Sequence, residues 1–163
     1  MGEILQMSID LIVSWPRHLD YPLFRQFIKD NRSKFHKVLI VFTDMNVANL
    51  DYRQLIQDFM RKDKVIFLDC LPAAAGEDWR NKAINMALTV SDAEWVYFTE
   101  QDFFPQENFW REVEDLARRC DVFGRFQEGR LHPCCIFIKR DLLNKTSQNF
   151  SVIPDEADHF AKI

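Results

Sequence analysis

The chain lacks several motifs that would assign a chemistry directly. It has only four glycines among 163 residues, and neither a G-x-G-x-x-G nor a Walker A sequence occurs. A classical dinucleotide site and a P-loop are therefore not expected. There is also no G-x-S-x-G sequence, which excludes the nucleophile elbow of the α/β-hydrolases.

Cysteine is scarce as well. The chain has four cysteines and no C-x-x-C pair: Cys70, Cys120, Cys134 and Cys135. A zinc knuckle or a thioredoxin-type redox motif is therefore unsupported. We expect reduced, buried thiols in an intracellular, cytoplasmic protein.

Targeting signals and an excess of positive charge are also missing. No apolar run approaches the ~20 residues that a membrane span needs, and the N-terminus has no basic segment followed by an apolar stretch, as a secretory signal would. Lys and Arg number 21 against 25 Asp and Glu, a net charge of −4. This acidic balance argues against nucleic-acid binding, which needs a basic footprint.

What the chain does contain is a regular alternation of two hydrophobic patterns. Short apolar runs are typical of strands buried on both faces, at 9–13, 38–42, 65–68 and 95–98. Apolar stripes at helical spacing lie between and after them, within 23–28, 55–60, 79–90 and 109–117. Two more strands are expected at 122–126 and 134–138, around a turn at 128–129. The succession predicts one α/β domain over residues 1–163, with a mostly parallel central sheet between layers of helices.

Polar residues follow the expected strands at the positions where parallel sheets bind ligands. Open α/β sheets hold their ligands outside the carboxyl ends of the strands, near the point where strand order reverses. A lone Asp in such a place is usually a helix cap or a turn residue, but here the placement repeats. The residues concerned are Ser14, Trp15, Asp44, Asp69, Glu100 and Asp102.

The most informative of these positions is the segment Thr99–Asp102, because it brings two carboxylates to one strand end. Glu100 and Asp102 are two residues apart, so in an extended chain they can face the same side. They could then share a divalent cation, Mg²⁺ or Mn²⁺. A metal there could bridge a diphosphate and stabilise it as a leaving group. The E-x-D pattern alone is weak, and taken by itself it is better explained by a solvated turn.

The surrounding segment adds specificity. Residues 78–87 read Asp-Trp-Arg-Asn-Lys-Ala-Ile-Asn-Met-Ala, and an apolar strand then leads to Glu100-Gln101-Asp102. This order resembles the central segment of the family 2-like glycosyltransferases of the GT-A fold, which carry an Arg-Asn pair opening a helix and a D-x-D motif after an apolar strand. The resemblance covers most of residues 8–140, and its specific part is the segment 78–105. It implies a Rossmann-like, three-layer GT-A sandwich that acts as a nucleotide-sugar transferase.

The resemblance also implies a nucleotide site. Ser14 and Trp15 would lie beside the nucleotide, and Asp44 would accept a hydrogen bond from the base. Arg80 would face the diphosphate, although a solvated helix arginine is the alternative. Glu100 stands where the family has an aspartate, so its direct coordination of the metal is in doubt.

For the metal and the chemistry, the resemblance points to the end of the chain. Asp102 stands where the family's main metal ligand stands, with Glu100 beside it, and His159 would complete the metal sphere. In inverting members the base is a carboxylate in the C-terminal third that deprotonates the acceptor hydroxyl. The candidates here are Asp155, Glu156 and Asp158, for which a capped helix start is an equal alternative.

The expected function is transfer of a sugar from a UDP- or GDP-linked donor to a carbohydrate or other hydroxyl acceptor, with Mn²⁺ or Mg²⁺. A nucleotidyltransferase is disfavoured because residues 14–19 contain no glycine. A degenerate domain that serves as a non-catalytic binding or assembly module remains an alternative. The length predicts an acceptor region that is short or missing. Either the acceptor site is minimal, or a partner subunit such as a second copy in a homo-oligomer supplies it, or the chain is a fragment.

Overall fold

The computed structural model describes residues 7–15, 21–42, 57, 65–69, 79–100, 105, 107–127 and 130–145 of the chain. Its central sheet has six strands, which are β1 Ile9–Trp15, β2 Lys37–Phe42, β3 Val65–Asp69, β4 Trp95–Glu100, β5 Val122–Gln127 and β6 Arg130–Lys139. The helical elements are α1 Tyr21–Asn31, the 3₁₀ turn η1 Arg32–Lys34, α3 Trp79–Val90, α4 Phe109–Ala117 and α5 Arg140–Lys145. Within the described ranges, no helix is long and apolar enough to cross a membrane.

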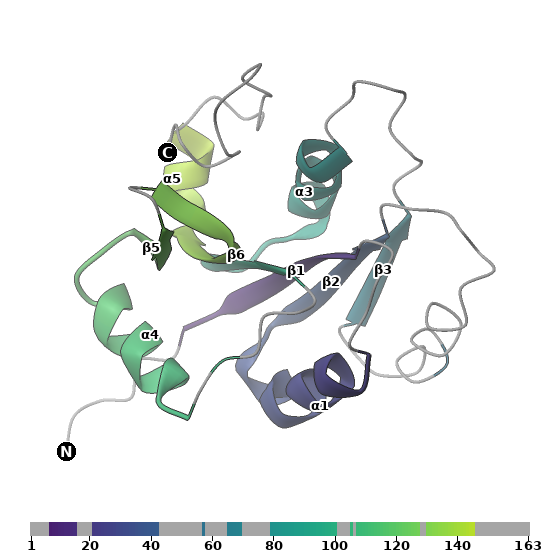
Figure 1. The fold of residues 1–163 in the computed structure, drawn as a ribbon. Helices are drawn as coiled ribbons and strands as arrows, with labels where there is room; N and C mark the ends of the chain where they lie inside the picture. Colours follow the sequence, from purple (N-terminus) through teal and green to yellow (C-terminus); the bar gives the residue numbers. More distant parts are fainter. Residues whose placement is uncertain are drawn as a thin grey trace.

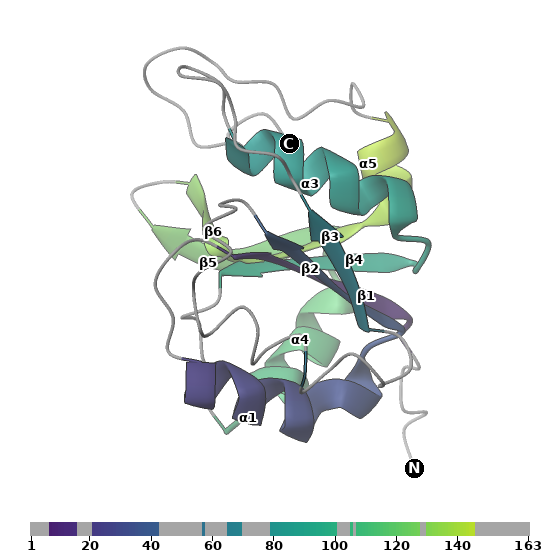
Figure 2. The same ribbon diagram turned by 90° about the vertical axis from the view of Figure 1, so that its right-hand side faces the viewer.

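The strands lie in the order β3-β2-β1-β4-β6-β5. Neighbouring pairs among β1, β2, β3 and β4 are parallel, whereas β6 is antiparallel to both β4 and β5. Helices α1 and α4 cover one face of the sheet and α3 and α5 cover the other (Figures 1 and 2). The predicted three-layer α/β arrangement with a mostly parallel sheet is confirmed.

Both faces of the sheet are buried, which explains the continuous apolar runs. On the face covered by α1 and α4 the core is rich in aromatic side chains, and Tyr97, Phe137 and Phe123 stack across β4, β6 and β5 with ring centroids 4.1 and 5.0 Å apart. On the α3 and α5 face the core is mostly aliphatic, with Leu39, Val96 and their neighbours. Because strand side chains alternate between faces, burial of both faces favours apolar residues at successive positions of these runs, with Asp10 of β1 as an exception.

The strand ends differ from the sequence expectation. Ser14 and Trp15 were expected after the first strand, but β1 continues to Trp15. Likewise Asp69 ends β3 and Glu100 ends β4 rather than following them. The reason is pairing, since Ser14 and Glu100 are partners across β1 and β4 and each extends the other's ladder. Strand ends are set by neighbouring strands, which the local sequence does not contain.

Two further expectations have different outcomes, and the structure adds one helix that was not expected. The expectation of buried thiols is wrong for Cys120, which is exposed, and correct for Cys135, which is buried. The helix expected over 55–60 lies outside the described residues, apart from Gln57, which is helical. Helix α5 was not expected, because its six residues, RDLLNK, are too few to show helical periodicity.

Candidate functional site

The candidate site is the edge of the sheet at which the parallel strands end, called here the carboxyl edge. From β1 the chain moves outward through β2 and β3, and then returns to the other side of β1 as β4. The strand order therefore reverses between β1 and β4, where open α/β sheets bind ligands. The register places Ser14 of β1 directly beside Glu100 of β4 at this point.

Other candidate residues lie at the same edge, at the ends of further strands and in the first turn of α3. Trp15, the last residue of β1, pairs with Phe42 at the end of β2, and Phe42 in turn pairs with Asp69 at the end of β3. Arg80 lies in the first turn of α3. This helix runs from the carboxyl edge back towards the start of β4, so its N-terminal turn lies at the carboxyl edge (Figure 2). The backbone thus brings together Ser14, Trp15, Arg80 and Glu100.

The remaining candidates lie outside the residues that the structure describes. They are Asp44, Asp102, Asp155, Glu156, Asp158 and His159. Their proposed roles stay predictions. Glu100 is the residue of the E-x-D pattern that the structure places, and carboxylate oxygen is a ligand type that both Mg²⁺ and Mn²⁺ accept.

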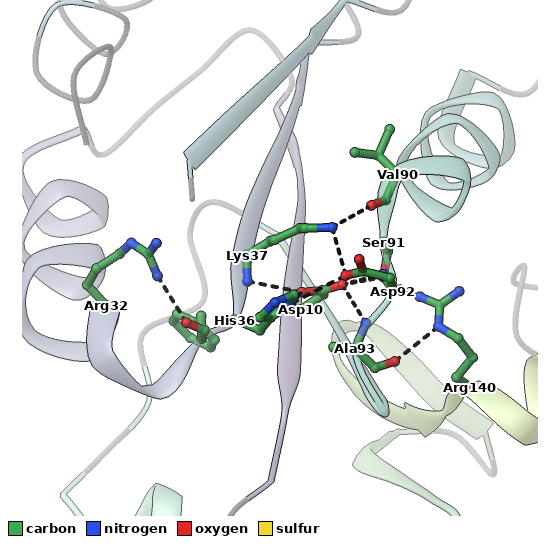
Figure 3. Close-up of polar contacts among 10 residues, drawn as sticks. Asp10, Arg32, His36, Lys37, Val90, Ser91, Asp92, Ala93 and Arg140 are labelled. Atoms are coloured by element: carbon green, nitrogen blue, oxygen red, sulfur yellow. Dashed lines mark hydrogen bonds and ion pairs between the residues drawn. The ribbon is translucent and has the colours of Figure 1, made fainter. Parts of the chain in front are cut away.

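At the opposite edge, where the parallel strands begin, the structure contains a buried carboxylate. Asp10 of β1 is 0% exposed and accepts several hydrogen bonds from other segments (Figure 3). Its Oδ2 accepts from the Ser91 hydroxyl at 2.8 Å and from the backbone N–H groups of Asp92 and Ala93 at 2.8 and 3.0 Å. Its Oδ1 accepts from the backbone N–H of Lys37 at 3.0 Å. Asp10 therefore joins the start of β2 and the α3–β4 turn to β1.

Charged side chains surround this carboxylate. His36 Nδ1 lies 3.2 Å from Asp10 Oδ1 and 3.3 Å from Asp92 Oδ1. The Lys37 ammonium lies 2.7 Å from Asp92 Oδ1 and donates to the carbonyl of Val90 at 3.1 Å. The hydrogen bond from Lys37 is the largest influence on the pKa of Asp92 and holds it below its usual value. The group Asp10, His36, Lys37, Ser91 and Asp92 is called here the amino-edge cluster.

Arg140, the first residue of α5, holds the same α3–β4 turn from the side of β6. Its Nε donates to the carbonyl of Ala93 at 3.1 Å, and its guanidinium also donates to the Ser91 hydroxyl. The backbone N–H of Arg140 donates to the carbonyl of Glu94 at 2.8 Å. The α3–β4 turn is thereby held from β1, from β2 and from the start of α5 together.

Asp10, His36 and Asp92 have the donor types of a metal site, and their ligand atoms lie within 4.8 Å of one another. The hydrogen bonds argue against that role. Both oxygens of Asp10 already accept protein donors, and the Lys37 ammonium already supplies the cation beside Asp92. A metal would have to displace these partners and leave buried N–H groups unsatisfied, which is costly. The amino-edge cluster is therefore a structural clamp.

Sequence reasoning missed the clamp. The sequence gives no signal for His36, and Asp10 lies within an apolar run that indicates a strand. One signal was available, because a lone carboxylate within the run Ile9–Val13 must find partners when both faces of its strand are buried. Those partners are 26 to 83 residues away in the chain, so the sequence could not identify them.

Comparisons with known proteins agree on the fold. No family model and no curated protein sequence matches the chain. Among solved structures, it is similar to a mannosyltransferase from Pyrobaculum calidifontis in complex with GDP-Man and Mn²⁺, with 17% identity and a TM-score of 0.59 over 85% of this chain and 46% of that one. It is also similar to a mycobacterial protein, with 11% identity and a TM-score of 0.61 over 86% and 56% of the two chains.

A third similar structure is the glucosyl-3-phosphoglycerate synthase from Mycobacterium tuberculosis, in complex with phosphoglyceric acid. The identity is 11% and the TM-score 0.56, over 84% of this chain and 58% of that one. The chain thus spans about half the length of the solved structures that it matches. At such identities the likeness concerns architecture alone. The chain has the fold of GT-A-type glycosyltransferases, as its sequence pattern implied.

Proposed function

We propose that the chain binds a nucleoside-diphosphate sugar at the carboxyl edge and transfers the sugar to an acceptor hydroxyl. The observation that carries this proposal is the pairing of Ser14 with Glu100 at the reversal of strand order. Of the similar structures, one is a mannosyltransferase holding GDP-Man and Mn²⁺ and another is a glucosyl-3-phosphoglycerate synthase. Both activities are sugar transfers, which supports this class of reaction.

In this proposal the donor lies across the ends of β1 and β4. Ser14 and Trp15 lie beside the nucleotide, and Asp44 accepts a hydrogen bond from a ring N–H of the base. Arg80 binds the diphosphate, because a guanidinium matches the geometry of phosphate oxygens. Asp102 holds Mn²⁺ or Mg²⁺ together with Glu100 and His159. When bound, the metal neutralises charge that develops on the departing diphosphate.

The acceptor is activated by a carboxylate from the C-terminal segment, with Glu156, Asp158 and Asp155 as candidates. The acceptor oxygen bonds to the anomeric carbon while the bond from that carbon to the diphosphate breaks. The diphosphate leaves with the electron pair, and the hydroxyl proton passes to the carboxylate. An ordinary carboxylate suffices as base, because the hydroxyl becomes acidic only as the new bond forms.

Calorimetric titration tests the donor site. UDP and GDP are each titrated with and without Mn²⁺ into the wild type, Asp102→Asn and the control Asp121→Asn. Asp121 is an exposed carboxylate of the amino edge, paired with Lys139 at 2.7 Å. We expect Mn²⁺-dependent binding that Asp102→Asn weakens by about 100-fold or more, given how strongly even indirect ligand partners affect metal sites, and that Asp121→Asn leaves unchanged. No binding of either nucleotide to the wild type would contradict the proposal.

A non-catalytic binding module is the second candidate, and Glu100 favours it because a glutamate stands at the first acidic position of the motif. Both candidates predict nucleotide binding, so turnover separates them. With GDP- or UDP-sugar and Mn²⁺, a transferase slowly releases the nucleotide by transfer to water, whereas a binding module releases none. Location in the cytoplasm and self-association stay predictions, and sedimentation measures the latter.

A further inference from the structure

We draw no further inference here: the strongest candidate, the amino-edge cluster around the buried Asp10, belongs to the clamp already described, in which both oxygens of Asp10 and the Lys37 ammonium already have their partners within the protein.

Discussion

The two edges of the parallel sheet use polar residues in opposite ways. At the amino edge, Asp10 is buried and accepts hydrogen bonds from the ends of other segments of the chain, so its bonding capacity is used within the protein. At the carboxyl edge, Ser14 and Glu100 end adjacent strands at the reversal of strand order, the place where such sheets bind ligands. The carboxylate at the amino edge therefore stabilises the fold, whereas in the proposed function the carboxylate at the carboxyl edge holds the metal of the donor.

The strongest test of this comparison is Asp10→Asn. The amide of asparagine replaces one carboxylate oxygen with an N–H₂ group. With that group at the Oδ1 position, the backbone N–H of Lys37 loses its acceptor, and at the Oδ2 position the Ser91 hydroxyl and two backbone N–H groups lose theirs. We expect the free energy of unfolding to fall by about 2–3 kcal/mol, since an unsatisfied buried donor costs about 1–3 kcal/mol and the remaining hydrogen bonds lose their charged acceptor. Urea denaturation measures the loss, with Asp121→Asn as the surface control. Nucleotide affinity of the folded protein should not change, and a loss of affinity without a loss of stability would reverse the roles of the two edges.

A smaller effect is expected from Lys37→Met. Methionine keeps the length of the side chain but removes the ammonium that lies 2.7 Å from Asp92 Oδ1 and donates to Val90. We expect a loss of about 1 kcal/mol, the range for one partly exposed ion pair with a hydrogen bond. Titration of Mn²⁺ into Lys37→Met combined with Asp102→Asn should show no binding, because the oxygens of Asp10 remain occupied. Binding of Mn²⁺ to that double variant would make the amino-edge cluster a metal site.

The smallest effect concerns acid stability. The hydrogen bond from Lys37 lowers the pKa of Asp92 below its ordinary value of 3.8. A carboxyl whose pKa is lower in the folded state stabilises the fold above its unfolded pKa, and that contribution is lost as the pH falls below about 3.8 through the folded pKa. In Asp92→Asn the contribution is missing at all pH values, so its stability should approach that of wild type as the pH falls through this range. Urea midpoints at several pH values measure this, and a constant difference down to the lowest pH would contradict it.

Much of the fold could be predicted because the information is local. The apolar runs mark β1 to β4, and the spacing of apolar residues marks α1, α3 and α4. Helix α3 begins at Trp79 and ends at Val90, as its stripe indicates. The continuous apolar character of the strands also indicated burial on both faces, and the two core clusters confirm it.

The site could be predicted only in part. That Ser14, Trp15, Arg80 and Glu100 share one edge follows from parallel topology, which the alternation of strands and helices implied. The partners of Asp10 could not be predicted, because they lie on segments far apart in the chain. The roles expected for Asp102 and for Asp155 to His159 lie outside the described residues and stay predictions.

The sequence by itself determined the class of fold and the strand ends worth testing, because hydrophobic periodicity is local and parallel strands end at a common edge. Only the tertiary structure shows that the buried carboxylate at the amino edge, Asp10, already has its hydrogen-bond partners within the protein. It also decided that the hairpin of β5 and β6 reaches past β4. Both depend on strand register and on hydrogen bonds between segments distant in sequence, which arise only when the sheet is assembled.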